Sequence, residues 1–258
     1  MTLYNSIGKD YNFTRKADAR IVDQLVSLLN LPQGSKIADV GAGTGNYSNA
    51  IAEQGYEVIA IEPSEVMQRQ KQNHPQVSWL TAGAEKIPLA DNSVDGAVVM
   101  LALHHFKNIE AGIKEINRIT RSGKIVIFAF EQEKIPDFWL TDYFPYFIRD
   151  TIDTFPSTQK IAQLLAEITR EEAIVIPFLL PPDLKDLFAA AGWCQPEIYL
   201  DERVRKGISS FAKMPENELK AGLKRLSLEI ANNSWQQKYG YLLQQNEYDA
   251  GYRIIVNQ

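Results

Sequence analysis

The sequence has almost no cysteine and no long apolar run. Cys194 is the only cysteine among 258 residues, so neither an intrachain disulfide nor a cysteine-based zinc site can form. No stretch approaches the roughly 20 apolar residues needed to cross a bilayer, and residues 1–20 lack the apolar centre of a signal peptide. These absences predict a cytoplasmic protein that does not enter a membrane.

An excess of positive charge is also missing. The chain has 27 Lys and Arg against 32 Asp and Glu, which gives a formal net charge of -5 at pH 7. Proteins that bind nucleic acid or anionic membranes need a basic face, so we expect neither partner. Hydrophobic residues make up 45% of the chain, enough for an ordinary globular core. We expect a small-molecule partner and no metal site, and the sequence does not indicate the oligomeric state.

Short apolar runs alternate with helical patterns from Ser35 to Phe130. Strands are predicted at 36–40, 56–61, 77–80, 95–101 and 123–130. Helices are predicted between them at 47–54, 63–73 and 109–120. This alternation implies right-handed crossovers and a doubly wound, mostly parallel sheet.

The pattern changes after Phe130. Seven aromatic residues are crowded into 136–156. Further helices are predicted at 158–170, 181–193, 215–232 and 235–245, and strands at 196–204 and 252–258. We therefore expect an α/β core with an N-terminal helical arm over 1–130 and an inserted helical cap over 131–180. The rest of the core, with C-terminal strands and a helical insertion, is expected over 181–258.

The stretch "IADVGAGTGNYSNAIAEQG" places Gly41, Gly43 and Gly45 directly after the first strand. Ligands of open α/β sheets bind at the carboxyl ends of the strands, and glycine lets a ligand approach the backbone closely. A tight turn without a ligand is the alternative. The dinucleotide fingerprint G-x-G-x-x-G needs a third glycine where Asn46 stands. Asp39 suits an ammonium group better than a pyrophosphate, whereas Glu62 suits ribose hydroxyls in either class of ligand.

The motifs "DVGAGTG", "EPS" and "LHHF", in this order, resemble those of the class I S-adenosylmethionine-dependent methyltransferases. Within them, the chain is similar to the small-molecule branch, with a domain like that of ubiquinone and menaquinone biosynthesis methyltransferases. The resemblance covers about the first 130 residues and resumes more weakly at "LKDLFAAAGW". It implies a seven-stranded Rossmann-like sheet, S-adenosylmethionine as cofactor and methyl transfer to a small molecule.

The resemblance also implies roles for matching positions around the cofactor. The methionine and ribose would lie against Asp39, Gly41, Ala42 and Gly43, with Glu62 on the ribose. The adenine would be flanked by Pro63, Ser64 and Met67, with Ala84, Glu85 and Leu101 in the loops after the third and fourth strands. Tyr11 and Arg15 match an N-terminal segment that closes over the cofactor, although simple surface packing of this arm is equally open.

One departure from the family pattern concerns the adenine. Gly83 stands where the family often has an acid that accepts a hydrogen bond from the adenine amine. Adenine recognition would then rest on backbone groups or on Glu85.

Two features are candidates for binding or activating the molecule that accepts the methyl group. His104 and His105 follow the fourth strand, and either is a candidate general base, because histidine titrates near neutrality. Structural packing of one or both is the alternative. The aromatic residues of 136–156 either line a pocket or form the core of the cap. Among them Tyr143 and Tyr146 carry hydroxyls able to orient an acceptor.

The leading hypothesis is methyl transfer by in-line displacement, with the cap closing the pocket. Two alternatives stay open, a nucleotide-linked oxidoreductase and a non-catalytic protein that binds S-adenosylmethionine. The sequence does not tell which acceptor atom is methylated.

Overall fold

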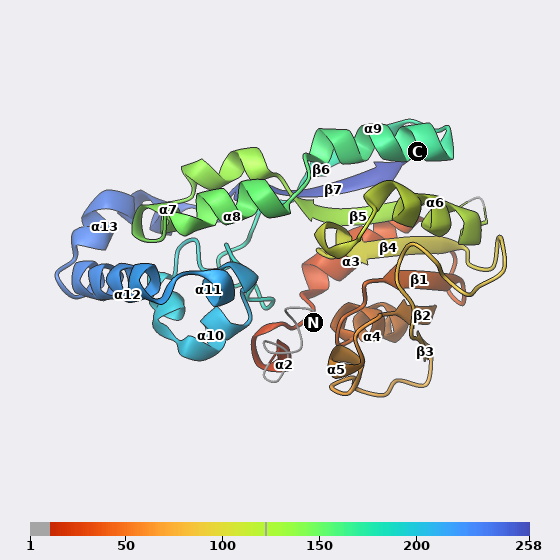
Figure 1. Cartoon of the computed structure of the whole chain (residues 1–258), viewed down its shortest axis with the longest axis horizontal. Helices are drawn as coiled ribbons and strands as arrows, with labels where there is room; N and C mark the ends of the chain where they lie inside the picture. Colours follow the sequence, from red (N-terminus) through yellow and green to blue (C-terminus); the bar gives the residue numbers. More distant parts are fainter. Residues whose placement is uncertain (1–10, 122) are drawn as a thin grey trace.

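A seven-stranded sheet forms the centre of the computed structural model, which describes residues 11–121 and 123–258, the first two by backbone only (Figure 1). The strand order is β3-β2-β1-β4-β5-β7-β6. Neighbours from β3 to β5 are parallel, and β7 is antiparallel to both of its neighbours. This confirms the predicted doubly wound, mostly parallel fold. The strands are β1 (Lys36–Val40), β2 (Glu57–Ile61), β3 (Val77–Leu80), β4 (Gly96–Met100), β5 (Ile125–Phe130), β6 (Ala173–Pro177) and β7 (Tyr252–Asn257).

Helices cover both faces of the sheet. On one face α3 (Ala19–Leu29) and α4 (Asn46–Glu53) pack on the strands, and on the other α6 (Ile109–Ile119) and α9 (Thr158–Thr169) do so. The apolar residues of α6 recur at helical spacing, so that Ile113, Ile116 and Ile119 are all fully buried. Two hydrophobic clusters result, one on each side of the sheet. Short helices lie at the edges of this core: α2 (Tyr11–Thr14), α5 (Glu65–Gln68) and η2 (Leu103–His105).

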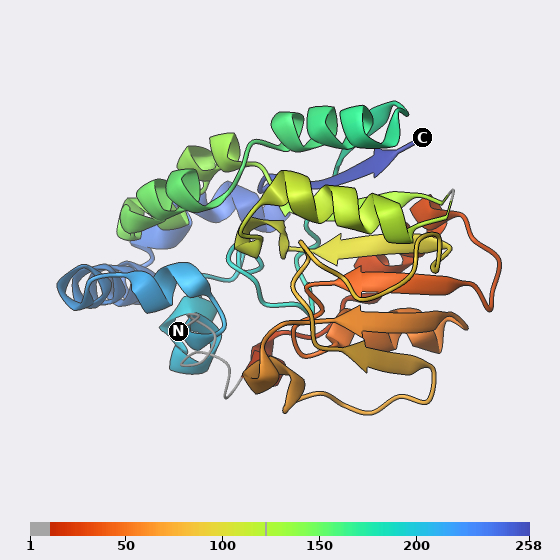
Figure 2. The ribbon, with the colours of Figure 1, turned by 45° about the vertical axis from the view of Figure 1, so that its right-hand side comes forward.

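Two helical segments, residues 132–154 and 196–244, pack together, and we call them the cap. Figure 2 shows the arrowheads of the parallel strands directed toward the cap. The Trp139 ring joins the two segments, because it lies 5.7 Å from Tyr199 and 5.3 Å from Trp235 between ring centroids. The cap contains η3 (Gln132–Asp137), α7 (Leu140–Tyr143), α8 (Tyr146–Thr154), η4 (Pro196–Leu200), α10 (Glu202–Lys206), α11 (Ser209–Lys213), α12 (Glu216–Ala231), α13 (Ser234–Tyr239) and η5 (Gly240–Gln244).

The structure differs from the expected division of the chain. The segment expected to be the cap, 131–180, also contains α9 and β6, which belong to the core. β6 was not predicted, because it is a short edge strand in which no residue is fully buried. The strand predicted at 196–204 is wrong, since this segment forms η4 and the start of α10. The helix predicted at 63–73 is reduced to α5.

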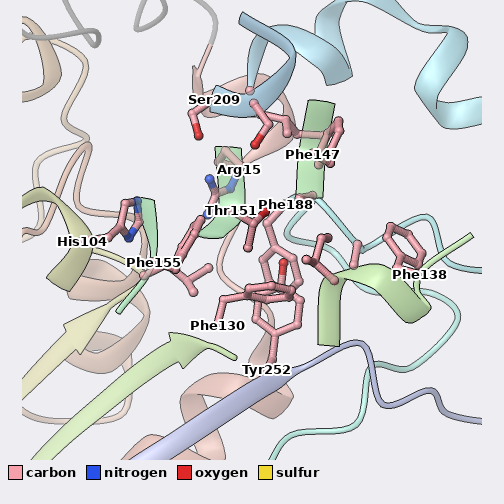
Figure 3. Close-up of a pocket in the computed structure, with 17 residues that line it drawn as sticks. Arg15, His104, Phe130, Phe138, Phe147, Thr151, Phe155, Phe188, Ser209 and Tyr252 are labelled. Atoms are coloured by element: carbon pink, nitrogen blue, oxygen red, sulfur yellow. The ribbon is translucent and has the colours of Figure 1, made fainter. Parts of the chain in front are cut away.

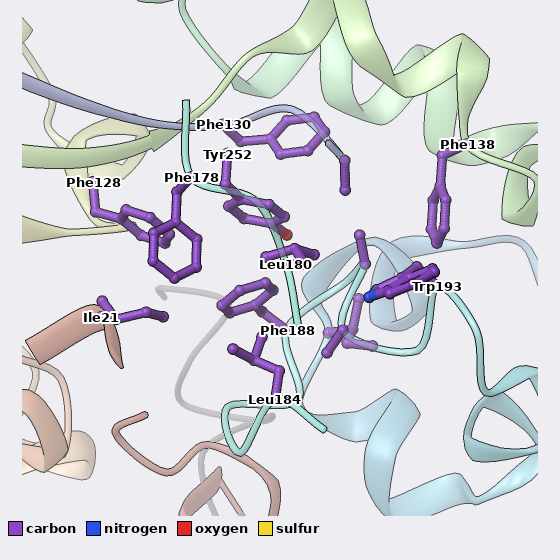
Figure 4. Close-up of a cluster of buried hydrophobic side chains, with 14 of the residues drawn as sticks. Ile21, Phe128, Phe130, Phe138, Phe178, Leu180, Leu184, Phe188, Trp193 and Tyr252 are labelled. Atoms are coloured by element: carbon purple, nitrogen blue, oxygen red, sulfur yellow. The ribbon is translucent and has the colours of Figure 1, made fainter. Parts of the chain in front are cut away.

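The helix predicted at 181–193 is also wrong. This segment is a chain of turns whose side chains fill the space between the core and the cap (Figure 4). Trp193 is fully buried and stacks on Tyr248 at 5.3 Å, and Phe188 lies 4.3 Å from the Tyr252 ring. The segment therefore buries apolar side chains in more than one direction, whereas an amphipathic helix would bury them along one face only.

Two findings bear on membranes and metals. Within residues 11–121 and 123–258, no helix is long and apolar enough to cross a bilayer. The same part of the chain holds no cluster of three or more side chains suited to bind a metal ion.

Candidate active site

A pocket lies against the glycine loop at the carboxyl ends of β1 and β4, and we call it the glycine-loop pocket. Its lining includes the loop and the first residues of α4, together with Asp39 from β1 and Leu101 after β4. Two remote residues, Arg15 and Asp186, complete the lining. Five positions predicted to surround the cofactor therefore line one pocket together with Arg15: Asp39, Gly41, Ala42, Gly43 and Leu101.

Two of the three glycines are required by contacts within the protein. At Gly41 the backbone angle φ is +81°, and an added Cβ would lie 2.4 Å from the Ala102 Cβ. At Gly45 φ is also +81°, and an added Cβ would lie 2.5 Å from the Trp79 ring. From the sequence, the glycines were expected to admit a ligand, with a tight turn as the alternative. Here Gly41 and Gly45 instead let the loop pack closely on the segments after β4 and on β3.

Replacing Gly41 with alanine is expected to lower the free energy of unfolding by about 3 kcal/mol, through overpacking and backbone strain together. Gly34 is the matched control, because its φ is +83° but an added Cβ meets no atom within 4 Å. Gly34→Ala should lose only about 1 kcal/mol, the strain alone. Urea denaturation of both variants measures the difference, and equal losses would contradict the steric argument.

Asp39 is the least compensated polar group of the glycine-loop pocket. The side chain is 1% exposed, and Oδ2 accepts a hydrogen bond from the Ser48 hydroxyl at 2.5 Å. Oδ1 has no hydrogen-bond partner in the described part of the chain. Burial, together with the charge of Glu62, raises the pKa of Asp39 to about 6, against the opposing effect of the Ser48 bond. A buried carboxylate oxygen without a donor fits a cationic ligand group, such as the ammonium of a methionine moiety.

Glu62 fixes the glycine loop from below. One carboxylate oxygen accepts from the Gly43 N–H at 2.9 Å and the other from the Ser64 N–H at 2.8 Å. Burial raises the pKa of Glu62 despite these two bonds. Ser64 in turn caps α5, and Met67 is buried beside Gly43. Each carboxylate oxygen keeps lone-pair capacity for a hydroxyl, so Glu62 fits a ribose at this edge of the loop.

The positions predicted beside the adenine have other partners. The Glu85 carboxylate accepts from the backbone N–H of Lys107 at 2.5 Å and of Asn108 at 3.2 Å, which ties it to the start of α6. Ala84 is buried in the hydrophobic cluster of α6. Gly83 lies beside Glu85, because an added Cβ would be 3.2 Å from Oε2.

A second pocket lies between the sheet and the cap, and we call it the aromatic pocket. Figure 3 shows Phe130, Tyr252 and Phe138 around one part of it and His104, Arg15 and Ser209 around another. Arg15 and Leu101 line both pockets, so the two meet at these residues. Leu101 has a φ of +48°, a left-handed conformation that is strained for leucine. Its N–H donates to the Phe128 carbonyl at 2.9 Å, which holds the turn in place.

Of the two histidines, only His104 lines the aromatic pocket. Its ring lies 3.8 Å from the His105 ring and 4.3 Å from the Phe155 ring, between centroids. Burial holds the pKa of His104 well below its usual range, and the His105 ring and the charges of Lys213 and Arg15 add to this. His104 is therefore neutral at pH 7. His105 is exposed and is not part of the lining.

Some aromatic residues of 136–156 line a pocket, and others form the core of the cap. Phe138, Phe147 and Phe155 line the aromatic pocket, whereas Trp139 and Phe144 pack inside the cap. The two tyrosines chosen for an acceptor lie elsewhere. The Tyr143 hydroxyl donates to Glu229 at 2.6 Å within the cap, and the half-buried Tyr146 ring packs under Arg149. Neither lines the aromatic pocket.

Asp186 lines the glycine-loop pocket but was not among the predicted site residues. Its carboxylate is 1% exposed and accepts from Arg15 Nε, from Arg15 Nη2 at 3.2 Å and from the Tyr47 hydroxyl at 3.1 Å. These bonds fix Arg15 at the junction of the two pockets. No local motif marks Asp186, since its partners lie more than 130 residues away in sequence. The side chain of Tyr11 lies outside the described residues.

Comparison with known proteins identifies the family of the chain. Residues 38–128 match the family described as "Methyltransferase domain". A demethylmenaquinone methyltransferase of Corynebacterium urealyticum is 31% identical over 154 residues, covering 57% of this chain and 66% of that protein. A solved putative methyltransferase from an antibiotic biosynthesis pathway of Anabaena variabilis is 47% identical, with a TM-score of 0.92. That match covers 95% of this chain and 99% of the other.

A more distant structure shares the fold alone. Phosphoethanolamine N-methyltransferase 2 of Haemonchus contortus, in complex with S-adenosyl-L-methionine, is 17% identical with a TM-score of 0.58, over 98% of this chain and 56% of the other. The domain match, together with the likeness to the Anabaena protein over nearly its whole length, shows that this chain belongs to the S-adenosylmethionine-dependent methyltransferase family.

Proposed function

We propose that the protein transfers a methyl group from S-adenosylmethionine to a small molecule. One observation carries this proposal: Asp39 lines the glycine-loop pocket with a buried carboxylate oxygen that has no hydrogen-bond partner among the described residues, and this pocket meets the aromatic pocket at Leu101. The first pocket suits a cationic donor and the second an apolar acceptor. A protein without catalysis does not require this junction. An oxidoreductase would also need its cofactor to meet its substrate, but the Asp39 carboxylate suits an ammonium group better than the pyrophosphate of a dinucleotide.

On the donor side, Asp39 would hold the ammonium group and the loop from Gly41 to Gly43 would lie along the methionine. Glu62 would accept from the ribose hydroxyls. The adenine would lie near Pro63, Ser64, Met67 and Ala84, with Tyr11 and Arg15 closing over the cofactor. The two bonds from the start of α6 both end on Glu85 Oε1, so Glu85 Oε2, which lies beside Gly83, and the loop backbone around Gly83 are the proposed sources of adenine contacts.

On the acceptor side, we propose that His104, rather than His105, contacts the reacting molecule. When bound, the cofactor supplies an already activated methyl group, so the protein contributes mainly alignment and exclusion of water. The cap covers the aromatic pocket with Phe138 and Phe147 and would perform this exclusion. Both segments of the cap, 132–154 and 196–244, would therefore close the pocket, a role that was expected for residues 131–180.

The acidic charge balance and the single cysteine support a small-molecule substrate rather than nucleic acid, and a cytoplasmic site of action.

Calorimetric titration of the purified protein tests the donor site. We expect S-adenosylmethionine and S-adenosylhomocysteine to bind with micromolar affinity, and NADH not to bind. Glu62→Gln should weaken S-adenosylhomocysteine binding by roughly tenfold or more, because it loses hydrogen bonds to a charged acceptor. Glu65→Gln is the matched control, since Glu65 is 76% exposed on the same segment, and it should bind like the unmodified protein. NADH binding, or no binding of either sulfur compound, would refute the proposed function.

A further inference from the structure

The aromatic pocket is unusual in its charge. Its lining contains rings, small residues and hydroxyls, and none of the described residues that line it is acidic. Arg15 is the lining residue that carries a full charge at neutral pH. An acceptor with a protonated amine would find no carboxylate to pair with, whereas an acceptor with a negative charge would find a guanidinium.

A second cation, Lys213, is not part of the lining but acts on the lining residue His104. Lys213 on α11 is close enough to His104 for its charge to disfavour protonation of the ring, as Arg15 also does. Two elements, the N-terminal arm and the cap, thus each supply a cation whose charge acts on the His104 ring. The carboxylates that pair with these cations lie outside the pocket. Asp150 accepts from Lys213 Nζ at 3.0 Å and from the Ser210 hydroxyl at 2.7 Å, and Asp186 lines the other pocket.

We propose that the acceptor is an aromatic oxyanion, a carboxylate or a phenolate, and that it is methylated on that oxygen. This inference rests on the proposed function. The ring of the acceptor would pack among Phe130, Phe138 and Tyr252, and the oxyanion would lie toward Arg15 and Ser209 (Figure 3). This places the negative oxygen at the junction with the glycine-loop pocket, where methyl transfer has to occur.

The chemistry of this acceptor removes the need for a base. A lone pair of the oxyanion forms the new O–CH3 bond, the C–S bond breaks, and its electron pair remains on sulfur, which becomes neutral. No proton is released. A neutral imidazole carries one N–H donor, so His104 is suited to hold the oxyanion by a hydrogen bond. Opposite charges cancel in the transition state, a change that a water-poor, apolar pocket favours.

A cationic acceptor is the natural competitor, because aromatic faces attract cations. The two positive groups at Arg15 and Lys213 oppose it. Their effect extends into the pocket, since electrostatic interactions are screened less among buried groups than at a surface.

Three ligands of equal shape test the charge preference: 2-naphthoate, the neutral 2-naphthamide and the cationic 2-naphthylmethylamine. Each is titrated into the protein saturated with S-adenosylhomocysteine. We expect 2-naphthoate to bind at least tenfold more tightly than 2-naphthamide, and the amine more weakly than both. With S-adenosylmethionine, mass spectrometry should detect methyl 2-naphthoate. A parallel assay with 4-nitrophenolate at about pH 8 tells whether the oxyanion is a carboxylate or a phenolate.

Ser209 allows a matched test of the same charge effect. It lines the aromatic pocket but not the glycine-loop pocket, and it begins α11, where aspartate and asparagine are both tolerated. Ser209→Asp should weaken 2-naphthoate binding by about tenfold or more through like-charge repulsion, while 2-naphthamide binding changes little. Ser209→Asn, of the same shape, should keep the ratio of the two affinities. Melting temperatures and S-adenosylhomocysteine binding show that both variants are folded.

The outcomes separate the two proposals. If S-adenosylhomocysteine does not bind, the proposed function fails. If it binds and 2-naphthoate binds no better than 2-naphthamide, or if the amine binds best, only the oxyanion proposal is overturned. Equal effects of Ser209→Asp and Ser209→Asn on 2-naphthoate would also overturn it.

Discussion

Replacing Asp39 with asparagine is expected to abolish measurable binding of S-adenosylmethionine and yet to stabilise the ligand-free protein at neutral pH. The carboxylate is 1% exposed, and one of its oxygens has no donor among the described residues. At pH 7 its ionised form is therefore poorly solvated and opposes folding. Asparagine retains an oxygen to accept from Ser48 but carries no charge to pair with an ammonium group.

The pH dependence follows from the sign of the pKa shift. Burial raises the pKa of Asp39 to about 6 from an ordinary value of 3.8, so the folded protein binds this proton more tightly than the unfolded chain does. The protonated Asp39 side chain contributes favourably to the free energy of folding. This contribution is complete below the ordinary pKa of 3.8 and is lost as the pH rises through 6. The loss of folding free energy approaches about 3 kcal/mol. Asp39→Asn can therefore stabilise the protein at pH 7 by at most this amount. Cofactor affinity has the opposite trend and should fall up to about tenfold per pH unit below pH 6.

Denaturation from pH 4 to 8 and calorimetric titration over the same range measure the two trends. Ser48→Ala is the control, because it keeps the carboxylate but removes the bond that favours ionisation. It should move the fall in cofactor affinity to higher pH. If Asp39→Asn binds S-adenosylmethionine as tightly as the unmodified protein, Asp39 is not the ammonium site.

Replacing Asp186 with asparagine is expected to lower the free energy of unfolding by about 3 kcal/mol, because removing one partner of a buried ion pair leaves the other charge uncompensated. Arg15 is 15% exposed at the side chain and depends on Asp186 for two of its hydrogen bonds. For a chain of this length the melting temperature should fall by roughly 5 to 10 °C. Because Arg15 lies at the junction of the pockets, S-adenosylhomocysteine should also bind more weakly.

Asp183 provides the matched comparison, since it lies three residues earlier in the same segment and pairs with Arg20. Asp183 is 68% exposed at the side chain, and a pair of this kind contributes little. Asp183→Asn should leave both the melting temperature and cofactor binding unchanged. Similar effects of the two substitutions would show that Asp186 has no special role in holding Arg15.

The parts of the fold that the sequence predicted are those with local signals. β1, β2, β4 and β5 each coincide with a compact apolar run, and the helices after them have one apolar face or a capping residue such as Ser64 or Asn108. The glycine loop follows from its spacing. The loop lies at the carboxyl end of β1, and β4 is the neighbouring strand. The fold alone therefore predicts that Asp39, Gly43 and Leu101 lie close together.

The prediction failed where hydrogen-bond partners are remote. In the segment 181–193, the Lys185 N–H donates to Asp18 at 2.9 Å, the Leu187 N–H to the Thr14 carbonyl at 2.9 Å, and the Gly192 N–H to the Tyr199 hydroxyl at 3.1 Å. These donors are the ones that a helix would use, so tertiary contacts replace the helix that local composition favours. Asp186 was missed for the same reason. Of the aromatic segment 136–156, Phe138, Phe147 and Phe155 line the aromatic pocket, whereas Tyr143 and Tyr146, which were chosen for their hydroxyls, do not; local sequence does not tell which rings of such a segment line a cavity.

The place of β7 in the sheet determines the order in which the chain can complete its fold. β7 is formed by residues 252–257, but it lies between β5 and β6, and among the described residues β6 pairs with no other strand. During synthesis, β6 therefore has to wait about 75 residues for its neighbour, and the second cap segment, 196–244, emerges from the ribosome in between. A break between Pro177 and Tyr252 removes β7 and leaves β6 without a strand to pair with, so two strands leave the sheet instead of one. It also removes Tyr252 from the aromatic pocket, so a chain shortened by a few residues would lose its acceptor site while its donor site remains formed.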